Sequence, residues 1–261
     1  MGKGIKTFIK NAAPKAFNFL LFLVIWQLIV VVFKIKVFIL PSPIRVLQHL
    51  FYPPIAAKYN WWLHVGATFM EVIVSFVATA IAGIFIAVMI CWSPVMNQLL
   101  SPIIILFNSL PKIALAPLFL VWFGYGFLPN ILVAFMVAFF PVVINSAAGL
   151  MAVEEDLLDL VNYLNATKAQ IFIKIRIPNS LPYIFAGLKI SATMCVVGSI
   201  VGEFIAADKG LGYLLRDAQA FIDTPTMFAC LFLLSIIGLA LFFAIGQLER
   251  LVMPWNRRRE A

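Results

Sequence analysis

The sequence predicts an all-α integral membrane protein with six transmembrane helices. Of its 261 residues, 64% are hydrophobic and 11% are charged, whereas soluble domains carry roughly 25% charged residues. Most of the charges lie at the ends of long apolar runs, and a helix needs about 20 apolar residues to cross a bilayer. Both ends of the chain are basic. Basic segments favour the cytoplasmic side, so the number of crossings should be even.

The first apolar run predicts a span over residues 16–33. The preceding residues, 1–15, carry four lysines and no acid, which favours a cytoplasmic N-terminus. A signal peptide is the alternative, but the run is long and no small-residue cleavage site ends it. Residues 34–64 would then form an external loop, in which 45–51 make a short amphipathic helix lying on the membrane surface.

Two long uncharged runs follow, one from Glu71 to Lys112 and one from Lys112 to Glu154. Each is about twice the length of a single span. Turn-forming residues divide them at 91–98 and 122–130. The predicted spans are 65–91, 99–121 and 129–149. Glu71 would lie in the membrane interface, near the external end of its span.

The last two spans are predicted over residues 184–206 and 224–248. The first of them contains small residues that let helices approach closely in lipid, among them Gly187, Gly198 and Gly202. Residues 207–225 would form an external loop. The transmembrane domain thus covers 16–248, and residues 249–261 form a basic cytoplasmic tail. This arrangement places more Lys and Arg inside than outside, as the positive-inside rule requires.

Residues 151–182 form the one long polar segment of the chain. Its acidic residues come first and its basic residues last, which suits the dipole of a helical segment. Asn165 lies between them and tolerates the left-handed conformation in which helices often end. We expect a cytoplasmic elbow of two short helices that bends at Asn165, with Pro178 stopping the second helix. A solvated surface loop is the alternative from the local pattern alone.

The sequence carries no motif for enzymatic chemistry. It lacks a phosphate-binding GxxxxGK[ST], a serine elbow, an HExxH and a close pair of carboxylates. We therefore expect neither ATP hydrolysis nor intramembrane catalysis by this chain. Its cysteines and histidines are isolated, so no disulfide, metal site or cofactor is expected. The positive charges are scattered, and no nucleic-acid binding is expected.

Polar groups inside the membrane are the candidates for a translocation pathway. Buried charges are costly in lipid and often line a pathway. Lys112 and Asn108 lie in a span that two prolines interrupt, and broken helices border cavities in transporters. Asn145 and Glu203 complete the candidate set. The alternatives are that Lys112 snorkels or pairs inside the bundle, and that Glu203 is an interfacial or helix-packing residue.

The polar segment resembles the coupling segment of permease subunits of binding-protein-dependent ABC importers. That family's pattern is Glu-Ala-Ala, three residues, Gly, nine residues, Ile, one residue, Leu-Pro, and the spacing fits here without a gap. The matching positions are Asp159, Leu160, Val161, Asn165, Ile175, Ile177 and Pro178. Asp replaces Glu, bulky residues replace the two alanines and Asn replaces Gly. These departures affect how closely the segment would fit the ATPase subunit that drives such permeases.

Further stretches narrow the resemblance to the nitrate, sulfonate, taurine and bicarbonate branch of these permeases. They are residues 40–43, 110–118, 122–126, 141 with 145, 178–183 with 187–188, and 203 with 210–212. The resemblance implies a type I ABC importer permease fold, with cytoplasmic coupling helices, in the cell inner membrane. It implies that the ATPase-coupling residues are the seven matching positions.

The resemblance also implies the partners and the mechanism. They are a second copy of this chain, a cytoplasmic ABC ATPase dimer and an external substrate-binding protein, working by alternating access. An ATPase-independent channel or secondary transporter and a non-transporting scaffold are the competing classes. For the substrate, a sulfonate or taurine, nitrate or bicarbonate, and a pyrimidine or vitamin precursor are all open.

Overall fold

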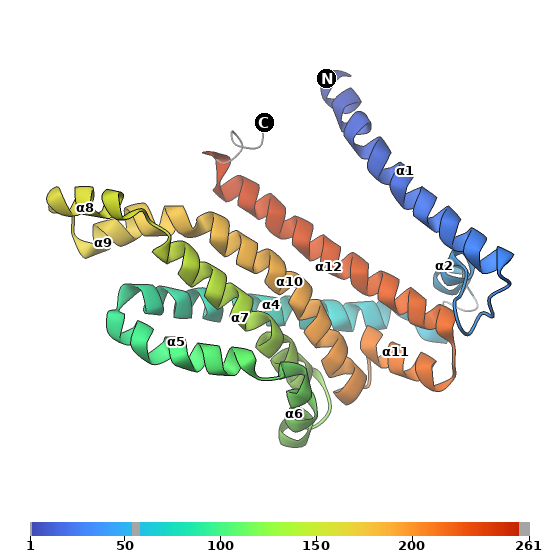
Figure 1. Ribbon diagram of the computed structural model, residues 1–261. Helices are drawn as coiled ribbons and strands as arrows, with labels where there is room; N and C mark the ends of the chain where they lie inside the picture. Colours follow the sequence, from blue (N-terminus) through green and yellow to red (C-terminus); the bar gives the residue numbers. More distant parts are fainter. Residues whose placement is uncertain (1, 54–57, 256–261) are drawn as a thin grey trace. The chain divides into compact units, whose positions relative to one another are not determined.

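The computed structural model describes residues 2–53 and 58–255, and the side chains of this range apart from 2–13, 15, 16 and 19. Within these residues every regular element is a helix (Figure 1). Lipid offers the backbone no hydrogen-bond partners, and a helix satisfies its N–H and C=O groups internally. The chain forms two compact units, Met1–Trp62 with Leu214–Phe232, and Leu63–Tyr213 with Leu233–Ala261.

The first unit contains α1 (Gly2–Val32) and α2 (Pro43–Phe51). The second unit contains most of α4 (Trp61–Trp92), then α5 (Pro94–Ser109), the 3-10 turn η1 (Lys112–Leu115), α6 (Ala116–Phe123), α7 (Phe127–Met151), α8 (Glu155–Tyr163), α9 (Lys168–Ile171), the π-helical turn η2 (Phe172–Arg176) and α10 (Ile177–Ala206). Besides α4, the helices α11 (Leu211–Ala220) and α12 (Thr224–Val252) also contribute residues to both units.

Four helical stretches of the described chain are long and apolar enough to cross a membrane: α4, α7, the continuous Lys168–Ala206 run and α12. The pair α5 and η1–α6 makes a fifth candidate that is bent by 83° at a short break. The predicted span 16–33 falls in α1, whose described apolar part is Leu20–Val32. An all-helical, multi-span membrane fold is therefore confirmed. The three arginines at 257–259 of the predicted cytoplasmic tail lie outside the residues that the structure describes.

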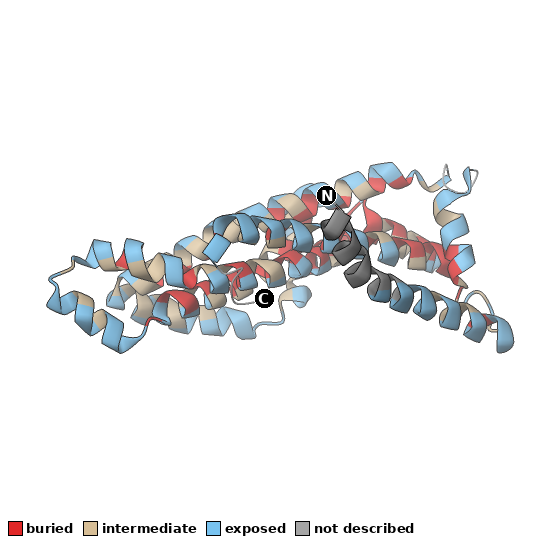
Figure 2. Cartoon of the chain, turned by 90° about the horizontal axis from the view of Figure 1, so that it is seen from above, coloured by how far each residue is buried: buried red, intermediate tan, exposed pale blue. Residues whose placement is uncertain are grey.

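Buried residues lie on the faces where helices pack against each other (Figure 2). Many large apolar residues on the opposite faces are exposed. On α4, for example, Ile81 is 67% exposed and Phe85 is 62% exposed. The surface of a soluble protein differs in this respect, because large exposed apolar patches are rare on it. These faces suit contact with lipid or with other membrane-embedded chains.

The helices α7 and α10 lie side by side and contact each other extensively (Figure 1). A Cβ atom added to Gly198 would lie 2.4 Å from Cα of Ala134, and one added to Gly202 would lie 2.7 Å from Cα of Asn130. Both contacts are with backbone, which cannot rotate away. The predicted role of small residues in close helix packing is therefore visible in this pair.

The segment expected to be an external loop, 207–225, contains the ten-residue helix α11. Gly210 turns the chain from α10 into α11 with a φ of 115°, a conformation that favours glycine. Leu211, Leu214 and Ala218 are buried, and their spacing places them on one helical face. The prediction missed this helix because its apolar stripe is only three residues long.

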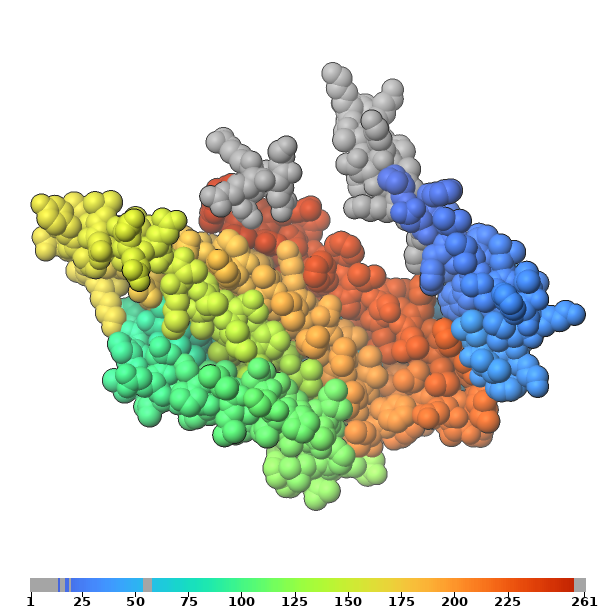
Figure 3. Space-filling view, viewed as in Figure 1, coloured from blue at the N-terminus to red at the C-terminus, as the bar shows by residue number. Residues whose placement is uncertain are grey.

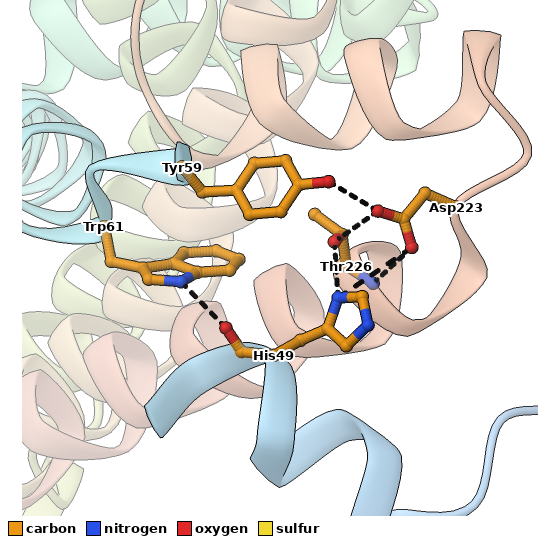
Figure 4. Close-up of polar contacts among 5 residues, drawn as sticks. All are labelled: His49, Tyr59, Trp61, Asp223 and Thr226. Carbon is orange, nitrogen blue, oxygen red and sulfur yellow. Dashed lines mark hydrogen bonds and ion pairs between the residues drawn. The ribbon is translucent and has the colours of Figure 1, made fainter. Parts of the chain in front are cut away.

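In the first unit, polar contacts tie α2 to the start of α12 (Figure 4). The hydroxyl groups of Tyr59 and Thr226 donate to Oδ2 of Asp223, at 2.6 Å and 2.7 Å. On the α2 side, Nδ1 of His49 lies 3.1 Å from Oγ1 of Thr226, and Nε1 of Trp61 donates to the carbonyl of His49 at 3.2 Å. Asp223 is thus the acceptor that joins these elements.

The charge state of Asp223 follows from these contacts. Burial alone would raise its pKa, but hydrogen bonds from Tyr59 and Thr226, with His49 nearby, outweigh burial and hold the pKa below its ordinary value. Asp223 also precedes the first residue of α12 and accepts from the N–H of Thr226 at 3.4 Å, the contact of an N-terminal cap.

We predict that Asp223→Asn lowers the free energy of unfolding by about 1–2 kcal/mol at neutral pH, a figure that allows for partial exposure. The folded pKa lies below the unfolded value of 3.8. The stabilisation is therefore complete above that value and is lost as the pH falls through the folded pKa. Thermal unfolding should show a constant difference from wild type above about pH 5 and a shrinking one below about pH 4. A difference that survives in acid would contradict the assignment.

A matched pair of glycine variants tests the contact between α7 and α10. Gly198→Ala should destabilise the protein by about 1–3 kcal/mol, because the methyl group must push the two helices apart. Nothing lies within 4 Å of a Cβ atom built on Gly66 in α4. Gly66→Ala should therefore be neutral or stabilise by up to about 1 kcal/mol. Melting curves in one detergent compare them, and equal melting temperatures would refute the close contact.

Candidate functional site

The polar segment 151–182, hereafter the elbow, protrudes at one end of α7 and α10 (Figures 1 and 3). Glu155 and Asp156 lie in the first turn of α8, where acidic side chains interact favourably with the helix dipole. The next helix, α9, begins with a capping box in which Thr167 and Gln170 each accept a backbone N–H of the other. Each short helix of the elbow therefore has its own start signal.

The bend predicted at Asn165 is present. Asn165 has a φ of 56°, and its N–H donates to the carbonyl of Asn162 at 2.9 Å. The N–H of Ala166 donates to the carbonyl of Val161 at 3.0 Å. These two bonds, with a left-handed residue between them, make a Schellman motif that ends α8.

The expectation that Pro178 stops the second helix is wrong. Helix runs without interruption from Lys168 to Ala206, and Pro178 lies in the first turn of α10. A proline lacks the N–H and crowds the carbonyl four residues back. The preceding turn, η2, is π-helical, and the N–H of Ile177 donates to the carbonyl of Phe172. This wider turn adds a residue ahead of the proline, so the helix continues through it.

The root of the elbow is fixed by apolar packing. Phe172 is only 6% exposed and packs with Ala87 of α4 and Leu150 of α7. The ring of Trp92 meets it edge-on at a centroid distance of 5.0 Å. Such aromatic contacts add to the stabilisation that burial provides. The elbow therefore has a buried anchor on two spans.

Hydrogen bonds fix the same root. Nη1 of Arg176 lies 3.0 Å from Sγ of Cys91 and donates to the carbonyl of Leu150 at 3.4 Å. Nδ2 of Asn179 donates to the carbonyl of Ala152 at 3.2 Å. The last carbonyls of a helix lack partners within it, and a cation at a helix C-terminus is favourable. Arg176 thus joins η2 to the end of α7.

The outer surface of the elbow carries large apolar side chains. Leu160 is 55% exposed, Tyr163 is 85% exposed and Leu164 is 68% exposed. We call these three residues the apolar tip. Exposed apolar groups within a polar segment commonly mark a surface for another protein. The segment thus has a buried root and an apolar tip.

The residues predicted for ATPase coupling divide between these two parts. Exposed ones are Asp159, Leu160, Asn165 and Pro178, and half-buried ones are Val161, Ile175 and Ile177. Ile177 packs against the Phe172 anchor. The matching positions therefore include both outward-facing residues and residues of the root.

Two of the predicted pathway residues lie together at the bend between α5 and α6. Nζ of Lys112 donates to the backbone carbonyl of Asn108 at 2.8 Å and to its Oδ1 at 2.9 Å. It also lies 4.7 Å from the ring centroid of Phe140, a cation–π distance. Lys112 thus caps the end of α5 through local, exposed contacts with Asn108.

The other two pathway candidates lie elsewhere. Nδ2 of Asn145 donates to the carbonyl of Pro141 at 2.7 Å within α7. Glu203 has no exposed surface, and its neighbour Gly202 contacts Asn130 in the first turn of α7. Asn145 is near the other end of that helix. The four predicted residues therefore do not form one site, and Glu203 is closed to solvent in this structure.

Glu71 and Glu203 form a buried acidic pair that the sequence patterns did not predict. Glu71 is 2% exposed, and its carboxyl group lies within hydrogen-bonding reach of Glu203. The expectation of no close carboxylates rested on their distance along the chain. A signal was present, because His64, Thr68 and Glu71 follow helical spacing and form a polar stripe on an apolar helix.

The fold now defines a class of protein. The structure resembles that of the MetNI methionine ABC transporter in its inward-facing form, with a TM-score of 0.61 and 23% identity, over 72% of this chain and 94% of that one. The class that the fold defines is therefore an all-helical membrane bundle like the one in that transporter.

The family follows from the sequence comparisons. Residues 79–254 match the family of binding-protein-dependent transport system inner membrane components, and the chain belongs to this family. The formylaminopyrimidine transport permease protein ThiX of Halalkalibacterium halodurans is 30% identical over 92% of this chain and 95% of its own length. The riboflavin transport system permease protein RibX of Chloroflexus aurantiacus is 31% identical over 91% of this chain and 88% of its own length.

The taurine transport system permease protein TauC of Escherichia coli is 29% identical over 90% of this chain and 86% of its own length. The chain is therefore the permease subunit of an ABC importer, from the branch that includes the taurine and sulfonate permeases. Permeases of this family work with a separate ATPase and a substrate-binding protein.

We predict that Lys112→Met changes the rate of solute uptake severalfold while the complex still assembles. The variant removes the ammonium group from Asn108, whereas the flexible thioether still packs on Phe140. Uptake by proteoliposomes and recovery of the complex are the two measurements. Lys36→Met, at an exposed lysine, is the control. Unchanged uptake would limit Lys112 to a structural role.

Proposed function

We propose that the elbow is the surface through which a cytoplasmic ATPase dimer drives this permease. The observation that carries the proposal is the apolar tip, Leu160, Tyr163 and Leu164, on a segment whose root is fixed to two spans. The seven positions that match the coupling pattern lie in the same segment. Of these positions, Leu160 belongs to the tip, and Ile177 belongs to the root.

A protein partner explains the apolar tip better than lipid does. The tip lies among exposed charged residues, including Asp156, Asp159 and Lys168, and charged side chains are costly inside a bilayer. A groove on a soluble subunit can bury apolar side chains and leave neighbouring charges in water. Interfaces of this kind have an apolar centre and a polar rim.

The buried root would pass movement of the tip to the spans. Phe172 and Arg176 connect the elbow to α4 and α7, and α10 continues from it as one helix. When ATP binding closes the ATPase dimer, the elbow and these helices would move together. The pathway would then open on the far side to receive solute from the binding protein, as alternating access requires.

We also propose that two copies of this chain form the pathway. None of the residues of α5 is buried within the chain, although this helix carries Asn108 and Ser109 next to Lys112. Exposed polar groups on a spanning helix fit a protein interface or an aqueous pathway better than lipid. A second copy placed against α5 would enclose them.

The orientation in the membrane belongs to the same proposal. An ATPase on the inner face requires a cytoplasmic elbow and, with six spans, cytoplasmic termini in the inner membrane. The distribution of Lys and Arg supports this orientation. The relatives are named for formylaminopyrimidine, riboflavin and taurine. Because such different solutes pass through similar permeases, we assign selectivity mainly to the binding protein.

Asn165→Val tests the proposal at the bend. A β-branched residue is strained at a φ of 56°, by about 1–3 kcal/mol, so the two helices of the elbow should change their angle. We expect ATP hydrolysis to continue while solute uptake per ATP falls severalfold.

The control is Asn165→Gly, which adopts the same φ without strain and should keep wild-type coupling. Uptake and phosphate release are measured on the same proteoliposomes, with permease, ATPase and binding protein present. Wild-type coupling in the Val variant would count against the bend. Uptake by the permease without the ATPase would overturn the proposal as a whole.

A further inference from the structure

A polar stripe on α4 receives the turn between α10 and α11. The side chains of His64, Thr68 and Glu71 are all buried, and they lie on one face of the helix. Three successive backbone N–H groups of the turn reach buried acceptors: Gly210 donates to Nδ1 of His64 at 3.0 Å, Leu211 to Oγ1 of Thr68 at 2.8 Å and Gly212 to Oε2 of Glu203 at 2.6 Å. This turn is therefore held by side chains of α4 and α10.

Two carboxyl groups meet beneath the turn. Glu71 and Glu203 are 2% and 0% exposed and lie within hydrogen-bonding reach of each other. Each has one oxygen already occupied: Oε1 of Glu71 accepts from Nδ2 of Asn130 at 2.9 Å, and Oε2 of Glu203 accepts from Gly212. Within the described residues, Oε2 of Glu71 and Oε1 of Glu203 are buried and accept no hydrogen bond, and the Thr68 side chain also interacts with the carboxyl group of Glu203.

The backbone leaves little room around this pair. A Cβ atom on Gly210 would lie 2.3 Å from Cδ of Glu203, and one on Gly212 would lie 2.7 Å from Cβ of Glu203. The carboxyl group of Glu203 is thus packed against the turn on one side and faces Glu71 on the other. Neither of the two free oxygens, Oε2 of Glu71 and Oε1 of Glu203, is exposed to water.

Two ionised carboxylates cannot share this place without a cation. An ionised carboxylate only accepts hydrogen bonds, and like charges at close range disfavour double ionisation. The charged or titratable groups nearby are Lys209, which acts on Glu71 electrostatically, and His64, which is bonded to Gly210 and stacks with Tyr213. In the part of the chain that the structure describes, neither side chain donates a hydrogen bond to a free oxygen of the pair.

We propose that Glu71 and Glu203 bind one proton between Oε2 of Glu71 and Oε1 of Glu203, and that this shared proton holds the 210–212 turn against α4 and α10. One carboxyl group then donates and the other accepts, so both free oxygens gain a partner. The pair carries a single negative charge. The N–H of Gly212, the amide of Asn130 and the nearby Lys209 offset that charge.

Loss of the proton would place two negative charges against each other in a buried site. The pair would separate, and the bond from Gly212 to Glu203 would be strained with it. The end of the permease opposite the elbow would therefore loosen when the proton leaves. This inference does not depend on the ATPase partner or on the role of the elbow.

Glutamine variants of the full chain in lipid nanodiscs separate the possibilities. In Glu71→Gln, the amide oxygen can still accept from Asn130 while its NH2 group donates to Glu203 in place of the proton. Glu203→Gln can do the same in the other direction, with its oxygen accepting from Gly212. Each single variant should melt within about 3 °C of wild type. In the double variant two NH2 groups face each other, and the melting temperature should fall by roughly 10 °C.

The pH dependence gives a second prediction from the same variants. Wild type should lose thermal stability as the pH rises from neutral to alkaline, because the proton leaves the pair. The single glutamine variants carry no shared proton and should lose less stability over the same range. Additive effects of the two substitutions, or equal pH dependence in all variants, would overturn the proposal.

Infrared spectroscopy of wild type tests the proposal even where a variant fails to fold. At neutral pH we expect the carbonyl stretch of one protonated carboxylic acid, absent from both single glutamine variants. Glu249→Gln is the control, because Glu249 forms an ion pair with Lys189 and its removal should leave the band in place. A wild-type spectrum without the band would overturn the proposal. So would stabilisation by sodium ions that both single variants lose, which would identify a bound cation.

Discussion

The close contact between α7 and α10 is the constraint on which the rest of the second unit depends. Gly198 and Gly202 meet the backbone of α7 at Ala134 and Asn130, at separations that no larger residue allows. In lipid, helices gain little from the hydrophobic effect when they associate, so close packing of small residues supplies much of the attraction. This contact sets the spacing of two long helices. It therefore also sets the positions of the elbow at one end of the pair and of the acidic pair at the other.

Both ends of this helix pair carry polar structure. At one end the chain leaves α7, forms the elbow and returns into α10, with Phe172 and Arg176 closing the gap to α4. At the other end Glu203 of α10 meets Glu71 of α4, and Asn130 of α7 bonds to Glu71. The same three helices thus hold the elbow with its exposed apolar tip and a buried acidic pair. A change at the elbow would reach the opposite end through packed helices and not through loops.

Local patterns predicted what depends on neighbouring residues, and failed where distant residues meet. Uncharged runs located the spans, and the identity of Asn165 was sufficient to place the bend. Pro178 was misread, because the π-helical turn that accommodates it depends on backbone geometry and not on residue type. The acidic pair was missed because Glu71 and Glu203 come from helices far apart in the chain. Asn145 and Lys112 were grouped by polarity, yet each bonds to its own surroundings.

Site-specific photo-cross-linking tests most directly whether the ATPase holds the elbow. Tyr163 and Tyr125 are 85% and 74% exposed and flank opposite ends of α7, so a benzophenone amino acid at either position replaces a similar ring. In the assembled complex, we expect an adduct with the ATPase subunit from position 163 and none from position 125. An adduct from position 125, or the absence of one from position 163 in a complex that hydrolyses ATP, would contradict it.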